Sequence, residues 1–255
     1  MRSVRDRARV TEAVARHQTP TVASRILPSS VERAARFLRR SGDVTHTTRS
    51  AADYIPARPT LPTLRAAAKK CRGCHLYKRA TQTVFGEGPR RATLLVVGEQ
   101  PGDAEDRAGH PFVGPSGTLL DRAFDAVGID RDDVYVTNAV KHFKWASEAR
   151  SKRRLHKTPN ASELRACRPW LEQEVALVRP AVILCLGATA AKALLGRTFS
   201  VLEHRGAAME SEWADAVFAT VHPSAVLRAP SGQRAAAERK FVSDLRRVAK
   251  HLRAR

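Results

Sequence analysis

A turn rich in glycine and proline follows the apolar run 93–98, in the segment GEQPGDAED. Such a turn leaves backbone N–H groups, first of all those next to Gly98, free to face a ligand. The side chains that we expect beside this turn, pointing into a cleft, are those of Glu99, Gln100 and Asp103. Glu99 is the carboxylate that could activate a water molecule, because the carboxamide of Gln100 cannot act as a base. A Gly-Pro turn after a strand is also common as a purely structural feature.

Three further side chains have the chemistry of a nucleobase site. Phe112 lies in the Pro- and Gly-bounded loop HPFVGPSG, where an exposed ring could stack on a base, although it could equally belong to the core. The carboxamide of Asn138 offers a donor and an acceptor that match the O4 and N3–H edge of uracil, whereas cytosine presents the opposite pattern. His222 could donate a hydrogen bond to a developing anion, or could simply cap a turn before Pro223.

The four cysteines of the chain have spacings that suggest metal binding. A chain of 255 residues needs no disulfide framework to support its core. Cys71 and Cys74 form a C-x-x-C pair, and Cys167 begins CRPW in a polar stretch, so it can supply a third thiolate. Cys185 lies inside the apolar run AVILCLG and is expected to be buried. The fourth ligand must therefore be another residue type, and either zinc or an iron–sulfur cluster suits such a set.

Alternating strand-length and helix-length patterns indicate which elements position these residues. Apolar runs typical of buried strands cover 93–98, 133–138, 181–187 and 216–221. Amphipathic runs typical of helices cover 116–128, 161–178, 188–196 and about 233–250. This order predicts an α/β fold, a three-layer α/β/α sandwich around a central, mainly parallel four-stranded sheet. In such sheets the loops after the strands border one cleft, so the candidate residues should meet there.

Composition limits the domain organisation and the class of partner. We expect one domain over 61–255, preceded by a basic, mostly flexible extension over 1–60 with a short helix near 30–40. The 45 basic against 25 acidic residues give a charge of +20, which favours a polyanion such as nucleic acid. Neither a membrane-spanning run nor a secretory signal is apparent, although the arginine-rich start also fits an organelle transit peptide.

Five segments carry a family resemblance: GEQPGDAED, PFVGPSGTLLDRA, TNAVKHFKW, LGATAAKALLG and HPS. In this order they resemble the uracil-DNA glycosylases of the iron–sulfur type, over about residues 62–250. A further segment, SKRRLHKTPN (151–160), is similar to the arginine-rich loop of the covalently trapping branch known as UdgX. His156 stands at the position of that branch's nucleophile, although Leu155 replaces the usual isoleucine. Without the resemblance, this loop would be read as a phosphate contact made by Lys152, Arg153 and Arg154.

The resemblance also implies a cofactor and a partner. His142 occupies the place where related iron–sulfur glycosylases have a cysteine, and the UdgX branch has histidine there. The resemblance therefore implies a structural 4Fe–4S cluster held by Cys71, Cys74, His142 and Cys167. The implied partner is uracil-containing DNA, preferably single-stranded, acted on by a monomer in the bacterial cytoplasm.

Three hypotheses for function follow, in order of preference. The first is a single-turnover uracil-DNA glycosylase in which neutral His156 attacks the sugar, while His222 and the backbone after Gly98 stabilise the uracil anion. The second is a conventional glycosylase that turns over and directs water with Glu99. The third is a nucleic-acid-binding module that contains a metal and has no enzymatic activity.

Overall fold

The computed structural model describes residues 49–147 and 153–255. Its centre is a five-stranded sheet in the order β2-β1-β5-β7-β6. The strands are β1 (Leu94–Gly98), β2 (Val134–Asn138), β5 (Val182–Leu186), β6 (Ala208–Met209) and β7 (Ala216–Thr220). Strands β2, β1, β5 and β7 pair in parallel, and every residue in these four strands is buried. The predicted parallel strands and the sandwich are confirmed, and the prediction of four strands missed β6, a two-residue edge strand antiparallel to β7.

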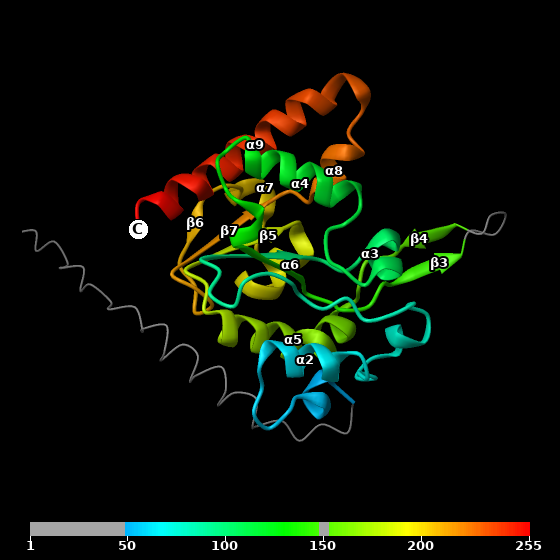
Figure 1. Cartoon of the computed structure of the whole chain (residues 1–255). Coiled ribbons are helices and arrows are strands. Elements are labelled where there is room, and N and C mark those ends of the chain that lie inside the picture. Colours follow the sequence, from blue (N-terminus) through cyan, green and yellow to red (C-terminus); the bar gives the residue numbers. More distant parts are fainter. Residues whose placement is uncertain (1–48, 148–152) are drawn as a thin grey trace, which may run out of the picture.

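Two helical layers cover the sheet (Figure 1). One face packs against α4 (Pro115–Asp125), α8 (Pro223–Leu227) and α9 (Ser231–Arg253), and the other against α5 (Ala161–Val178) and α6 (Ala188–Leu195). Because side chains alternate along a strand, Leu94 and Val96 join the first layer while Leu95 and Val97 join the second. The four helices predicted from the sequence are thus confirmed, and α5 has the predicted bounds.

Shorter elements surround the layers. They are η1 (Ala51–Tyr54), α2 (Leu61–Ala68), η2 (His75–Lys78), α3 (Asp103–Ala108), η3 (Arg131–Asp133) and α7 (Val201–His204). A two-stranded hairpin, β3 (Trp145–Ser147) and β4 (Arg154–His156), projects beside α3 and pairs Trp145 with His156 (Figure 1). Lys152, a predicted phosphate contact, lies outside the described residues.

The start of the described chain packs against the domain. Ala51 is fully buried in an apolar cluster with Leu64 and Trp170, and η1 contacts α5. Part of the segment predicted as an extension, residues 51–60, therefore belongs to the folded body. The helix predicted near 30–40 lies outside the described residues.

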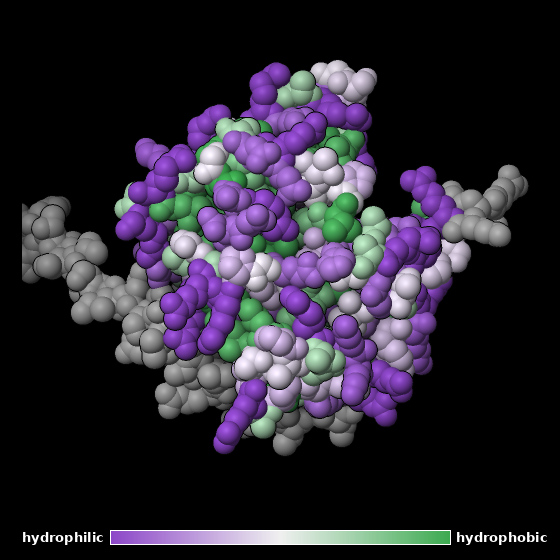
Figure 2. Space-filling model, viewed as in Figure 1, coloured by the Kyte–Doolittle hydropathy of each residue, from purple (hydrophilic) through white to green (hydrophobic). Residues whose placement is uncertain are grey.

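Hydrophilic side chains cover most of the face shown in Figure 2, including the outer surface of α9, and apolar residues occupy smaller areas between them. No helix within the described ranges is long and apolar enough to cross a membrane.

Candidate active site

A cleft of about 710 Å³ opens at the carboxyl ends of the parallel strands. The predicted site residues that line it are Glu99, Gln100, Phe112, Asn138, His156 and His222. They come from the loops after β1 and β7, from the last residue of β2, from the loop before α4 and from the hairpin strand β4. The structure thus brings together side chains from five separate segments of the chain, at the edge of the sheet where ligands bind in such folds.

Close packing of Phe112 and Asn138 depends on Gly98. A Cβ atom at position 98 would lie 2.3 Å from Asn138 Oδ1 and 2.8 Å from the tip of the Phe112 ring. Any larger residue would therefore push the carboxamide and the ring apart. Phe112 adopts a left-handed backbone with φ of 57°, which is rare for an aromatic residue and typical of functional sites. Phe112 as a whole is 8% exposed, and it belongs to the hydrophobic core while also lining the cleft.

His222 is held as a neutral hydrogen-bond donor. The backbone N–H of Ser224 donates to His222 Nδ1 at 3.1 Å, so this nitrogen is an acceptor and the ring proton resides on Nε2. Burial, together with the charges of His156 and Arg228, lowers the pKa of His222 to about 4. The ring lies nearly parallel to that of Phe112, with their centroids 6.4 Å apart. A neutral imidazole of this kind can stabilise an anion at neutral pH.

Glu99 faces both Thr189 and His156 with its two carboxylate oxygens. The hydroxyl of Thr189 donates a hydrogen bond to Glu99 Oε2. Glu99 Oε1 is buried, has no hydrogen-bond partner among the described residues, and lies 3.5 Å from His156 Nε2. Burial lowers the pKa of His156, the Glu99 carboxylate opposes this shift, and the Arg228 guanidinium adds to it. His156 is therefore predominantly neutral at pH 7, beside a carboxylate that can accept its proton.

Gln100 holds the hairpin against the sheet. Its carboxamide accepts a hydrogen bond from the backbone N–H of Lys144 at 3.0 Å and donates to the carbonyl oxygens of Lys144 and Lys157, both at 3.2 Å. The carboxamide, which the sequence predicted to point into the cleft beside Glu99, is thus engaged with the two chain segments that carry the hairpin. These contacts give Gln100 a role in positioning the adjacent His156.

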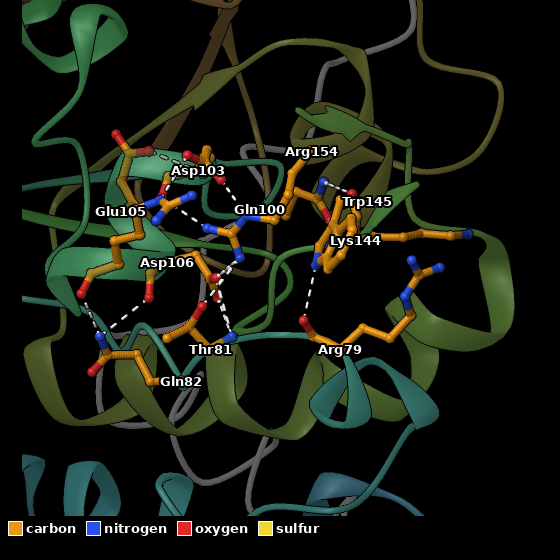
Figure 3. A network of polar contacts seen from close by, with 12 residues as sticks. Arg79, Thr81, Gln82, Gln100, Asp103, Glu105, Asp106, Lys144, Trp145 and Arg154 are labelled. Atoms are coloured by element: carbon orange, nitrogen blue, oxygen red, sulfur yellow. Dashed lines mark hydrogen bonds and ion pairs between the residues drawn. The ribbon is translucent and has the colours of Figure 1, made fainter. Parts of the chain in front are cut away.

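Arg154 fixes the other side of the hairpin to α3 (Figure 3). Its guanidinium donates to Asp103, to Asp106 Oδ2 at 2.6 Å and to Thr81 Oγ1 at 3.1 Å. The same group lies over the ring of Trp145 at 5.5 Å. Arg154 and Asp103 were predicted to contact substrate, but neither lines the cleft, and their contacts with each other position the hairpin. Arg153 is exposed on the same hairpin.

The predicted ligands of the cluster lie on segments that pack together. Cys71 and Cys167 are buried in one apolar cluster, which Cys74 packs against, and His142 and Cys71 line one cavity beside it. The indole N–H of Trp170 lies 3.4 Å from Cys71 Sγ. The backbone N–H of Lys141 donates to Cys167 Sγ at 3.2 Å. Such N–H donors stabilise metal-bound thiolates.

No three Cys, His, Asp or Glu side chains in the described ranges are close enough to hold a single metal ion. The three thiols, the imidazole and the N–H donors beside two of the sulfur atoms are chemically suited to an iron–sulfur cluster. Cys185 lies in the core between the sheet and α6, as predicted, and burial raises the pKa of its thiol to about 12.

A fully buried ion pair beneath the loop after β2 was missed by sequence reasoning. Lys141 Nζ lies 2.5 Å from Glu174 Oε2, and neither side chain is exposed. The ammonium also donates to Thr137 Oγ1 at 2.6 Å and to the carbonyl oxygen of Asn138 at 2.7 Å. Lys141 therefore joins the base of the cleft to the segment that bears Cys167. Nothing in the local sequence distinguishes this lysine from an exposed one.

Known proteins are similar to this chain over the part that forms the cleft. A family model described as "Uracil DNA glycosylase superfamily" matches residues 85–246. A "Type-4 uracil-DNA glycosylase" of Pyrobaculum aerophilum is 37% identical over 178 residues, covering 67% of this chain and 86% of that protein. Another, from Thermotoga maritima, is 36% identical over 166 residues, covering 65% and 82%. The crystal structure of Pedobacter heparinus SMUG2 superposes with a TM-score of 0.47 at 12% identity, covering 86% of this chain and 98% of that chain. All residues that line the cleft fall within the matched range 85–246.

Proposed function

The chain belongs to the uracil-DNA glycosylase superfamily, and we propose that it excises uracil from DNA and stays covalently joined to the abasic site through His156. The type-4 relatives support glycosylase activity. The matched segments cover 86% and 82% of the length of those two proteins. The covalent step and a preference for single-stranded DNA go beyond what those relatives' names state.

The observation that carries the proposal is the placement of His156. Its Nε2 lies 3.5 Å from Glu99 Oε1, at the wall of the same cleft that holds Phe112 and Asn138. A nucleophile needs to be within reach of the reacting carbon and beside a proton acceptor, and His156 has the acceptor. Its lowered pKa keeps the attacking imidazole neutral.

Recognition precedes the chemistry in the proposed sequence. The basic chain holds DNA by its phosphates, and the target uridine rotates out of the strand into the cleft. Phe112 stacks on the base, and the carboxamide of Asn138 pairs with its O4 and N3–H edge. A single strand suits this step, because no partner base has to be unpaired.

The bond change then conserves atoms and charge. The bond between uracil N1 and the sugar C1′ breaks, and its electron pair leaves with the uracil anion, which accepts a hydrogen bond from His222 Nε2–H. The ring nitrogen of His156 that carries no proton forms a bond to C1′ through its lone pair, and the imidazolium that results loses the proton of its other nitrogen, Nε2, to Glu99. The product is a protein–DNA crosslink, so each molecule acts once.

The iron–sulfur cluster would have a structural role in this scheme. Cys71, Cys74, His142 and Cys167 would hold it, and when bound it would cross-link the C-x-x-C segment to α5 and to the loop after β2. The residues of this chain that act on DNA lie in the separate cleft described above.

Conventional turnover is the second candidate function, and Glu99 favours it. Its buried Oε1 lacks a hydrogen-bond partner among the described residues, so it could direct a water molecule instead of accepting the proton of His156. The two functions differ in stoichiometry, which is directly measurable.

The test mixes the protein with excess uracil-containing single-stranded DNA and separates the products on a denaturing gel after boiling in detergent. A band that survives boiling, with uracil release ending at one equivalent, is expected. His156→Ala should abolish that band and retain DNA binding, whereas His251→Ala, which changes a histidine outside the cleft, should leave it intact. Continuing uracil release without a crosslink would replace the proposal with conventional turnover.

A further inference from the structure

Thr189 connects the helix after β5 to the catalytic carboxylate. It is the second residue of α6, lines the cleft, and donates its hydroxyl to Glu99 Oε2, although the two residues are 90 positions apart. No other hydrogen bond to the Glu99 side chain occurs within the described residues. The proposed reaction gives Thr189 no part.

The two oxygens of Glu99 therefore have different surroundings. Oε2 is bound by a hydroxyl, while Oε1 is buried, without a hydrogen-bond partner in the described chain, and 3.5 Å from His156 Nε2. A buried acceptor without a donor is unfavourable, so the surrounding contacts must hold it in place. The terminal torsion of glutamate is broad, so that one directed hydrogen bond largely decides which way the carboxylate faces. A β-branched threonine in a helix has few rotamers and gives its hydroxyl a defined direction.

We infer that Thr189 is a positioning residue that orients Glu99 so that Oε1 faces His156 and receives its proton. Without the hydroxyl, the carboxylate would rotate or draw in water, and its alignment with the imidazole would be lost. The inference rests on the proposed function for its kinetic consequence, and on the geometry of the free protein for its structural one.

Thr189→Val tests this inference because it removes the hydroxyl and keeps the shape, whereas Thr189→Ser keeps the hydroxyl. Thr118→Val serves as the control, since Thr118 is an exposed residue of α4 that is not among those lining the cleft. Uracil release and crosslink formation are timed separately in single-turnover reactions. Loss of one hydrogen bond to a charged group should slow crosslinking by about tenfold in Thr189→Val. Uracil release should change less, and Thr189→Ser and Thr118→Val should stay within about twofold of the wild type.

A second measurement does not depend on trapping. Nitrogen chemical shifts of His156 in the free protein report which ring nitrogen carries the proton. We expect protonation at Nε2, towards Glu99, in the wild type and in Thr189→Ser, and a mixture of both tautomers in Thr189→Val.

Wild-type crosslinking together with wild-type tautomers in Thr189→Val would overturn the inference, as would a Thr189→Ser variant as impaired as Thr189→Val. Should the wild type release uracil without crosslinking, the trapping proposal fails alone, and the His156 shifts still decide the role of Thr189.

Discussion

Replacing Lys141 by methionine should destabilise the protein strongly. Methionine keeps much of the length of the side chain and removes its charge, which leaves the Glu174 carboxylate in the core without its cation. The pair is completely buried, with 2.5 Å between Nζ and Oε2. The change also removes the two other hydrogen bonds of the ammonium, to Thr137 and to the Asn138 carbonyl.

The size of the effect follows from the burial of both partners. Removing one partner of a buried ion pair typically costs about 3–5 kcal/mol, because the remaining charge stays desolvated. For a chain of this size, that corresponds to a fall of roughly 6–20 °C in the midpoint of thermal unfolding. The double variant Lys141→Met/Glu174→Gln leaves no charge and retains an acceptor for the N–H of Gly86, which now donates to Glu174. It should lie within about 2 kcal/mol of the wild type.

The assay is thermal unfolding followed by circular dichroism, with all variants at one protein concentration and with equal iron content. Glu238→Gln is the control, because its pair with Arg122 is exposed and 3.4 Å long. That change should cost less than about 1 kcal/mol. The reasoning would be refuted if the unfolding midpoint of Lys141→Met fell no further than that of Glu238→Gln. It would also be refuted if the double variant lost as much stability as Lys141→Met and Glu174→Gln lose together.

Three further predictions concern the hairpin, the nucleophile and the cluster. Arg154→Met should slow crosslinking by about tenfold or more, because Arg154 fixes the hairpin, and it should leave the salt dependence of DNA binding unchanged. Arg153→Met removes a predicted phosphate contact, so it should lower the slope of log K against log salt by about 1. Because burial lowers the pKa of His156, the neutral nucleophile persists below pH 6.5, so the crosslinking rate should fall only at more acidic pH; a midpoint above 6.5 would contradict this. Cys167→Ser should lose bound iron in elemental analysis, while Cys185→Ser should retain it, and zinc in place of iron would disprove the cluster.

The sheet and main helices were predictable because their signals are local. Strands buried on both faces appear as continuous apolar runs, which the sequence shows at four places. The amphipathic run over 161–178 predicted the bounds of α5 correctly, and in the structure Asn160 and Glu163 form a capping box at its start. By contrast, β6 has two residues, too few for any alternation to be visible. The hairpin β3–β4 depends on Gln100 and Arg154, whose partners lie elsewhere in the chain.

The same distinction applies to the cleft. Glu99, Asn138 and His222 were predicted to meet because each follows a parallel strand, and strand ends converge in such sheets. The partners that orient them could not be found this way. Thr189 occupies an ordinary position near the start of a helix, and Lys141 has the polar character of a surface residue. Their roles arise from distances of a few ångströms between segments 90 and 33 residues apart.

Recognition and trapping depend on different parts of the fold. In the proposed function, uracil is held by Phe112 in the core cluster, by Asn138 at the end of β2 and by His222 at the start of α8. His156 instead sits on a small hairpin outside the sheet, fixed by Gln100 on one side and Arg154 on the other. The position of His156, the proposed nucleophile, is therefore set by a few polar contacts that the proposed uracil recognition does not use. Substitutions at those contacts should alter the fate of the abasic site without altering which base is removed.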